Sequence, residues 1–310
     1  MPIVSGEKML LESIGNTPLV PLFRASQATG CSILAKAEYL NPGGSIKDRI
    51  ARFILQEAEL RGELLPGHTI LEVTSGNTGI ALSMLGAIKG YRVVILMPCS
   101  VSQERRNMIL SFGAELRLLE GLLHMQDAVA QATEIAQNDA TVFLPRQFSN
   151  PDNARCHELN LGPEILAQTQ GKVDAFVMGV GTGGTLMGVG RALRAAGCRA
   201  KVVAVEPAES AVMSGGKPGC HGIQGLADGF IPALVNLQEV DLILQVSTAQ
   251  ARQKARQLAV EEGLLVGISA GANVLAAEQM ARKLGPGHTV VTVLCDRGER
   301  YLSLQAEKAS

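Results

Sequence analysis

Short apolar runs rich in β-branched residues alternate with helix-like segments along this chain, and the alternation restricts the fold more than any other feature. In the first half we expect strands at 69–73, 92–97 and 116–118 and helices at 80–89, 102–112 and 125–137. In the second half we expect strands at 173–178, 201–206, 240–246, 264–268 and 289–294. A strand–helix–strand rhythm builds parallel sheets with helices on both faces. The sequence therefore predicts an α/β protein with open, doubly wound sheets.

A polar stretch rich in Asn and Pro, residues 145–163, separates the two series of expected strands. Such composition is typical of a connecting segment rather than of a core element. We therefore place a domain boundary there. Two open α/β sheets would meet at a cleft, and such sheets bind ligands at the carboxyl ends of their strands.

Charge and cysteine usage exclude several classes of function. The 28 Lys and Arg residues nearly balance the 29 Asp and Glu residues, which leaves no basic stripe for nucleic acid or an anionic membrane. The six cysteines form no Cys-x-x-Cys pair, and the longest uncharged stretch, 175–190, is too short to span a membrane. We expect a cytoplasmic protein with reduced thiols, no metal site and no membrane segment.

A glycine-rich loop at 179–185 follows an expected strand and precedes an expected helix. Glycines let backbone N–H groups approach an anion, and a helix start adds partial positive charge, so the loop is suited to phosphate. Gly179, Gly181 and Gly184 also satisfy a dinucleotide-binding pattern, with Glu206 lying 22 residues after Gly184. From these residues alone, a phosphate monoester, a dinucleotide and an ordinary turn all remain open.

Three further junctions carry polar groups at the expected starts of helices. Lys47 lies in the first turn of a helix expected after the turn that begins at Asn41. A partly desolvated amine there would suit Schiff-base formation, although most lysines are simply solvated. Segment 74–79 could bind a carboxylate or merely cap a helix, and the Ser269 hydroxyl within 267–271 could also be a cap. Because an amine, a carboxylate cradle, a phosphate loop and a hydroxyl all fall at such junctions, we favour one shared site.

At this level of detail the chain resembles the cysteine synthases, or O-acetylserine sulfhydrylases, and their relative cystathionine β-synthase. The resemblance runs nearly end to end through blocks 14–18, 41–49, 74–79, 97–98 with 102–106, 147–151, 179–185, 223–232 and 298–303. It implies pyridoxal-phosphate fold type II, like the tryptophan synthase β-subunit, with the cofactor in a cleft between two domains. It also implies a larger cofactor-binding domain of residues 1–44 plus 154–310 and a smaller, mobile substrate-binding domain of residues 45–153.

The resemblance further implies a role for each site residue. Lys47 would be the catalytic residue and would carry the cofactor as an internal aldimine, Asn77 would bind the ring hydroxyl oxygen, and Ser269 would face the pyridine nitrogen. The phosphate would be held by Gly181, Thr182, Gly183, Gly184 and Thr185. The substrate α-carboxylate would be held by Thr74, Ser75, Thr78 and Gln147. Because a dinucleotide site leaves Lys47 and Ser269 without a task, we discard that alternative.

The implied reaction is β-replacement. Sulfide, or a related sulfur donor, would replace the acetoxy group of O-acetyl-L-serine through an aminoacrylate to give L-cysteine. A sibling reaction is the alternative, either cystathionine formation or use of O-phosphoserine or an amine nucleophile. Asn160-Leu161 and Asp228 depart from the usual family pattern, which leaves the sulfur donor and leaving group open. The resemblance also implies a homodimer and the C-terminal tail of serine acetyltransferase as a partner.

Overall fold

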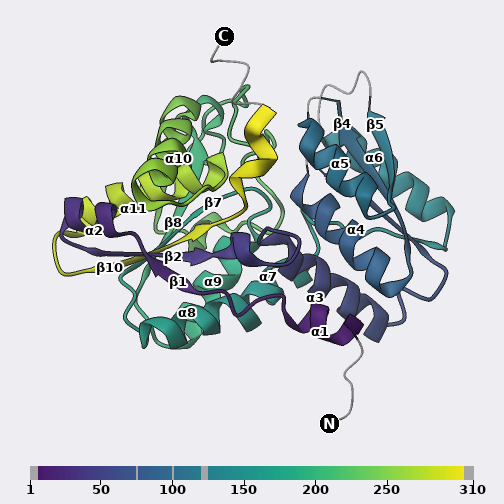
Figure 1. Cartoon of the computed structure of the whole chain (residues 1–310), viewed down its shortest axis with the longest axis horizontal. Helices are drawn as coiled ribbons and strands as arrows, with labels where there is room; N and C mark the ends of the chain where they lie inside the picture. Colours follow the sequence, from purple (N-terminus) through teal and green to yellow (C-terminus); the bar gives the residue numbers. More distant parts are fainter. Residues whose placement is uncertain (1–5, 75, 100, 120–124, 304–310) are drawn as a thin grey trace. The chain divides into compact units, whose positions relative to one another are not determined.

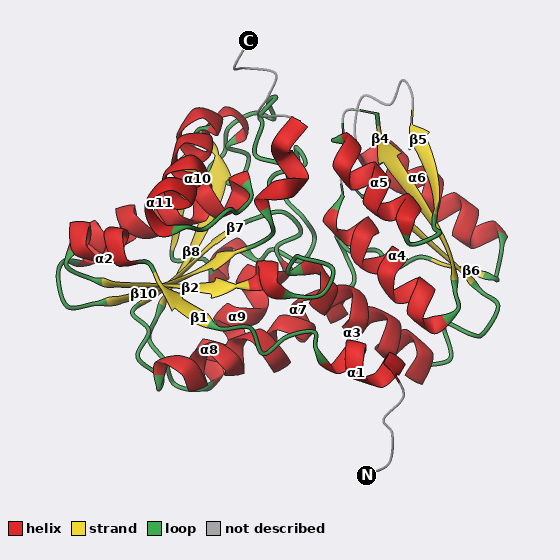
Figure 2. Cartoon of the chain, viewed as in Figure 1, coloured by secondary structure: helices red, strands yellow, loops and turns green. Residues whose placement is uncertain are grey.

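The computed structural model describes residues 6–74, 76–99, 101–119 and 125–303. The chain divides into two compact units, shown in sequence colours in Figure 1. Unit 1 comprises Met1–Ile14, Asn41–Gln147 and Glu299–Ser310, and unit 2 comprises Gly15–Leu40 and Phe148–Gly298. Each unit has its own sheet, drawn in yellow in Figure 2, and each is described by itself.

Unit 1 contains a parallel sheet in the order β5-β4-β3-β6. Its strands are β3 (Thr69–Val73), β4 (Arg92–Pro98), β5 (Glu115–Leu119) and β6 (Val142–Phe143). Its helices are α1 (Gly6–Glu12), α3 (Lys47–Leu60), α4 (Asn77–Lys89), α5 (Gln103–Ser111) and α6 (Met125–Asn138), and the 3-10 turn η5 (Gly298–Tyr301) follows the last strand of unit 2.

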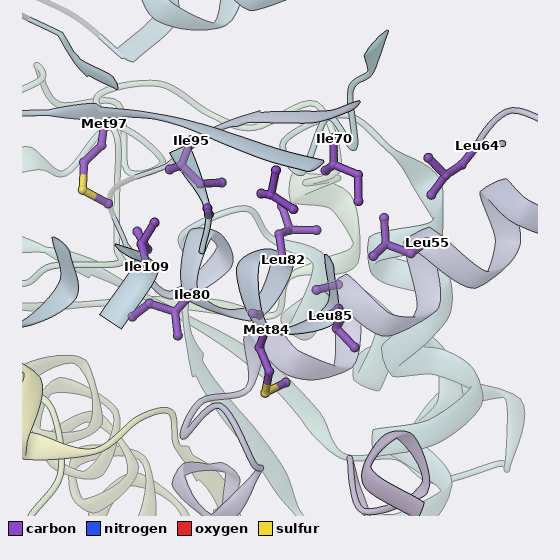
Figure 3. Packing of buried hydrophobic residues seen from close by; sticks show 14 of the residues in the cluster. Leu55, Leu64, Ile70, Ile80, Leu82, Met84, Leu85, Ile95, Met97 and Ile109 are labelled. Atoms are coloured by element: carbon purple, nitrogen blue, oxygen red, sulfur yellow. The ribbon is translucent and has the colours of Figure 1, made fainter. Parts of the chain in front are cut away.

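Both faces of the central strands β3 and β4 are buried, which explains why these two strands are almost continuously apolar. Ile70 and Ile95 pack with Leu55 and Leu82 of the two helices on one face, as Figure 3 shows. Their sequence neighbours belong to a second cluster on the opposite face, which is made of Leu71, Val73, Val94, Leu96, Ala128, Ala132 and Leu144. Successive side chains of a strand point to opposite faces, so one apolar run serves both clusters.

Unit 2 contains a six-stranded sheet in the order β1-β2-β10-β7-β8-β9, in which only the β1–β2 pair is antiparallel. The strands are β1 (Leu19–Pro21), β2 (Ser32–Ala37), β7 (Ala175–Gly179), β8 (Lys201–Pro207), β9 (Leu242–Val246) and β10 (Thr289–Leu294). The helices are α2 (Phe23–Thr29), α7 (Pro151–Cys156), α8 (Gly162–Thr169), α9 (Gly184–Ala195), α10 (Thr248–Glu262) and α11 (Ile268–Leu284). Shorter helical elements are η1 (Glu38–Leu40), η2 (His157–Leu161), η3 (Ala208–Ser210) and η4 (Leu237–Glu239).

The ends of several helices follow directly from the local sequence. Ser247 accepts a bond from the N–H of Gln250, whose side chain accepts from the N–H of Ser247, so a capping box starts α10. Gly263 then ends α10 in the left-handed conformation that glycine adopts without strain. Among the described helices, none is long and apolar enough to cross a membrane.

The predicted α/β class with open parallel sheets is confirmed, and two local predictions are wrong. Segment 264–268 forms no strand: Val266 makes one isolated bridge with Arg297, and α11 already begins at Ile268. Segment 145–163 is not a mere connection, because α7 and the π-helical element η2 lie within it and bury several polar side chains. Two of these buried side chains, Asn153 and His157, bind the glycine-rich loop of the same unit.

Candidate active site

Lys47 lies at the first residue of α3, as the sequence predicted, and it is half-buried. The turn before it is held by its own hydrogen bonds: Gly43 donates its N–H to Asp48 Oδ2 at 2.6 Å, and Lys47 donates its N–H to Ser45 Oγ at 3.2 Å. A side chain at Gly43 would place its Cβ only 2.5 Å from Asp48 Oδ1. The close approach of this turn to Asp48 therefore requires glycine and fixes where Lys47 begins the helix.

The segment between β3 and α4 carries the predicted carboxylate cradle. Thr74 accepts a bond from the N–H of Gly76 at 3.1 Å, and Asn77 and Thr78 form the start of α4. Gly76 has φ 149°, and a Cβ there would lie 2.5 Å from Cδ of Arg105. Ser75, the other predicted member of the cradle, lies outside the described residues.

Gln147 lies against this cradle, 69 positions along the chain from Thr78. The Thr78 hydroxyl donates to Gln147 Oε1 at 2.6 Å, and Gln147 Nε2 donates to the carbonyl of Val73 at 3.1 Å. The backbone N–H of Gln147 donates to Glu72 Oε2 at 3.3 Å. The fold thus brings together three of the four residues predicted to bind the substrate carboxylate.

Glu72 was not identified from the sequence, because it looks like one more residue of a buried strand. Its side chain is buried, and Oε1 accepts a 2.9 Å bond from the N–H of Val73. Burial raises the pKa of Glu72 to about 7, and the two backbone N–H groups of Val73 and Gln147 partly oppose that rise. A titratable group therefore supports the backbone of Gln147.

Arg300 is a second residue that sequence reasoning missed, although block 298–303 belongs to the resemblance. Its Nη1 donates to Asn77 Oδ1 at 2.6 Å, and its Nη2 donates to the carbonyl of Gly43. One guanidinium therefore joins the turn before Lys47 to the side chain of Asn77. Within unit 1 the structure links the predicted positions at Lys47 and Asn77 through Arg300.

The glycine-rich loop of unit 2 connects β7 to α9, as predicted. A Cβ at Gly181 would lie 2.3 Å from the carbonyl oxygen of Gly225, and one at Gly184 would lie 2.0 Å from Asn153 Oδ1. Gly183 has φ 84°, in the left-handed region. Only glycine fits these positions, and the backbone N–H groups at the start of α9 face no Cβ that would shield them from an anion.

Two buried polar side chains hold the hydroxyls of this loop. Asn153 Nδ2 donates to Thr182 Oγ1 at 3.0 Å, and His157 Nε2 lies 3.1 Å from Thr185 Oγ1. Both come from the 145–163 segment, which explains why that segment is polar yet buried. The unshielded backbone N–H groups of the loop and the hydroxyls of Thr182 and Thr185 are suited to bind the phosphate of a phosphate monoester.

Ser269 lies in the first turn of α11, where it is buried. One turn later, Asn273 Oδ1 accepts from the N–H of Gly179 at 2.7 Å, and Asn273 Nδ2 donates to the carbonyl of Val293 at 2.8 Å. Residues four apart share a helix face. Helix α11 therefore ties Ser269 to the beginning of the glycine-rich loop, a link that no local sequence pattern indicates.

The comparisons with known proteins agree with the resemblance. Residues 10–296 match the family described as pyridoxal-phosphate dependent enzyme. A cysteine synthase of Staphylococcus aureus (strain Mu50 / ATCC 700699) is 49% identical over 95% of this chain and 95% of its own. Among solved structures, the cysteine synthase (OASS) of Entamoeba histolytica has a TM-score of 0.91 and 43% identity, covering 96% of this chain and 90% of its own.

A third relative has a different name. The O-acetylserine-dependent cystathionine β-synthase of Helicobacter pylori has a TM-score of 0.90 and 33% identity, covering 98% of both chains. The resemblance, the type II fold and pyridoxal phosphate as the cofactor, all predicted from the sequence, are thereby confirmed. The chain belongs to the pyridoxal-phosphate-dependent enzyme family.

Proposed function

We propose that this enzyme is a cysteine synthase that replaces the acetoxy group of O-acetyl-L-serine by sulfide to give L-cysteine. The observation that carries the proposal is the 49% identity to a cysteine synthase over 95% of both chains. The local geometry supports it, because each described residue assigned by resemblance lies at a helix start, in the glycine-rich loop or beside the cradle.

Pyridoxal phosphate, when bound, draws electrons from the α-carbon of an attached amino acid and so weakens the bonds around it. In this chain Lys47 would hold the cofactor covalently, and residues 181–185 would bind its phosphate. Asn77 would donate to the ring hydroxyl oxygen. Ser269 would face the ring nitrogen. A serine hydroxyl does not transfer its proton to that nitrogen, so the ring would stay nearly neutral and would accept electrons less strongly, which favours β-elimination over transamination.

Lys47 would also move the proton that the reaction requires. An amine at this half-buried helix start would remove the α-proton of the substrate while the acetoxy group leaves. The same amine would return the proton to that carbon after sulfide has added to the β-carbon. Because acetate, the first product, leaves before sulfide reacts with the amino-acid part that stays on the enzyme, the kinetics would be ping-pong.

The carboxylate cradle would position the amino acid. The cradle contains only neutral hydrogen-bond donors, which are Thr74, Ser75, Thr78 and Gln147. They would bind an α-carboxylate by hydrogen bonds, without a cation to neutralise its charge. In the described geometry the Thr78 hydroxyl and the Gln147 nitrogen already donate to protein oxygens. An incoming carboxylate would replace one of these acceptors, which would move the 74–78 segment toward the substrate and exclude water.

A sibling reaction is the second candidate function. It is favoured by the match to a protein named O-acetylserine-dependent cystathionine β-synthase, which would use the same leaving group with a different nucleophile. Asp228 and Asn160-Leu161, which depart from the usual family pattern, are the residues we would associate with such a change. O-phosphoserine as donor, thiosulfate as sulfur source and an amine nucleophile belong to the same alternative.

Assembly and location are proposals that rest on the resemblance. We infer a cytoplasmic homodimer whose active-site cleft also binds the C-terminal tail of serine acetyltransferase, with residues 45–153 as the mobile domain and 1–44 plus 154–310 as the cofactor-binding domain. Light scattering that gives a monomer mass would contradict the dimer. A tail peptide that fails to bind the holoenzyme would contradict the partner.

The decisive experiment follows the visible absorbance of the purified holoenzyme. O-acetylserine should shift the cofactor band, and sulfide should restore it with formation of cysteine. A band that responds only when homocysteine or O-phosphoserine is supplied would favour the sibling reaction, and no band after reconstitution with pyridoxal phosphate would refute the proposal. Lys47→Ala should abolish the covalent band and turnover, whereas Lys172→Ala, at an exposed lysine, should change neither.

A further inference from the structure

We propose that Arg300 is a positioning residue of the active site, which fixes the orientation of the Asn77 amide so that its nitrogen is presented to the cofactor. The proposal rests on the function proposed above, in which Asn77 contacts the cofactor. It assigns a role to the segment after the last strand, which lies more than two hundred positions from Asn77 in the chain.

The contact itself determines which end of the amide faces Arg300. A guanidinium carries only donors, so the atom 2.6 Å from Arg300 Nη1 has to be the oxygen of Asn77. Rotating the amide by half a turn would set its NH₂ group against the cation. Because the amide is planar, Nδ2 is directed to the side opposite Arg300, where it can donate to a ring oxygen.

Arg300 is itself held firmly enough to act as a reference point. Its side chain is 2% exposed, its Nη2 donates to the Gly43 carbonyl, and its own carbonyl accepts from Ser102 Oγ at 2.9 Å. The next residue, Tyr301, is buried under the guanidinium of Arg105, which lies 4.7 Å from the ring centre. The start of α5 thus holds the backbone at 300–301, while Gly43 and Asn77 hold the guanidinium, which cannot shift without breaking both of these bonds.

The charge of Arg300 adds to its geometric effect. A cation bonded to an amide oxygen draws electron density from the amide and makes its N–H groups stronger donors. Such a donor suits the partly negative ring oxygen of pyridoxal phosphate. Without Arg300, the Asn77 amide would populate both orientations. In one of them the amide oxygen of Asn77 would face the ring oxygen of the cofactor, and the two would repel each other.

A double-mutant cycle on the holoenzyme tests this inference. We expect Arg300→Met to weaken pyridoxal-phosphate binding about tenfold and to change the pH titration of the visible cofactor band. In the Asn77→Ala background, the same substitution should weaken binding less than about twofold, because the amide that Arg300 orients is gone. Arg300→Lys, which keeps one charged donor, should recover part of the affinity.

Two controls separate positioning from general structural support. Arg106→Met removes another arginine of unit 1, which donates to the backbone carbonyls of Val101 and Cys99, and it should leave the cofactor band unchanged. Equal effects of the Arg300 substitution in the wild-type and Asn77→Ala backgrounds would overturn the inference. Arg300→Lys replaces Arg300→Met in the cycle if the latter does not fold. A wild-type enzyme that binds no cofactor would instead refute the proposed function.

Discussion

The side chains of Thr78 and Gln147 are joined by a 2.6 Å hydrogen bond in which the threonine donates and the amide oxygen accepts. The side-chain nitrogen of Gln147 also donates to the Val73 carbonyl, so Gln147 joins the end of β3 to the start of α4 in one hydrogen-bonded network. A buried polar network of this kind positions its members accurately as long as all of them remain paired.

Thr78→Val should therefore impair substrate binding more than folding. Valine has nearly the shape of threonine but no hydroxyl, so it removes the bond to Gln147 and one proposed donor to the α-carboxylate. We expect KM for O-acetylserine to rise at least about tenfold, which is the loss of roughly one hydrogen bond to a charged group. Thr133→Val, which removes a hydroxyl bonded only within α6, is the control, and an equal KM for both variants would contradict the assignment.

Gly181→Ala should weaken both cofactor binding and stability. The new methyl group would lie 2.3 Å from the Gly225 carbonyl oxygen, a backbone atom that cannot rotate away as a side-chain end can. Overpacking of this kind costs about 1–3 kcal/mol, and displacement of the loop would reduce pyridoxal-phosphate affinity as well. Gly190→Ala in α9 faces the ends of the Val202 and Arg194 side chains and should keep cofactor affinity. Unfolding in urea and cofactor titration measure the two effects.

The raised pKa of Glu72 makes a prediction about pH. The folded state holds this proton more tightly than the unfolded chain, since the pKa rises from 4.5 to about 7. Its contribution to stability is thus complete below about pH 4.5 and is lost as the pH rises through about 7. Glu72→Gln should flatten the dependence of the unfolding free energy on pH over this interval, by up to about 3 kcal/mol.

Urea unfolding of the wild type and of Glu72→Gln between about pH 5 and about pH 8 tests this prediction. Glu115→Gln is the matched control, because Arg117 and Arg92 lower the pKa of that exposed carboxyl and its contribution changes only in acid. Wild type and Glu72→Gln with parallel profiles would contradict the prediction.

The sequence predicted the architecture because the relevant pattern is local. Runs of β-branched residues such as 69–73 and 92–97 indicate strands directly. The helix start at Asn77 follows from the end of the first of these strands, and the helix start at Lys47 follows from the turn before it. Strands β1, β2 and β6 were not predicted. The polar segment at 145–163 was misjudged because Asn153 and His157 are satisfied by Thr182 and Thr185, partners that no local pattern reveals.

The supporting residues of the site could not be predicted for the same reason. Glu72, Asn273 and Arg300 act on residues that are brought near them only by folding, and each resembles an ordinary strand or helix residue in the sequence. Gln147 was assigned by resemblance alone, and its contact with Thr78 spans 69 positions. The chemical roles of all these residues stay predictions until the variants are measured.

A buried ion pair in unit 2 gives a final prediction about stability. Lys36 of β2 is fully buried; its Nζ donates to the Thr17 carbonyl and to Glu164 Oε2 at 2.6 Å, while Glu164 Oε1 accepts from the N–H of Asn16. Lys36→Met leaves the Glu164 carboxylate without its cation in a largely buried place, which should cost about 3 kcal/mol.

A second substitution, at Glu164, shows whether that loss of stability comes from the unpaired charge of the Glu164 carboxylate. Adding Glu164→Gln to Lys36→Met should recover part of the stability, because a neutral amide needs no counter-ion and can still accept from Asn16. The exposed pair Arg61–Glu63 is the control: Glu63→Gln should change the unfolding free energy by no more than about 1 kcal/mol, since water screens that pair. If the double variant were as unstable as the sum of the two single variants, the Lys36–Glu164 pair would not be the cause of the loss.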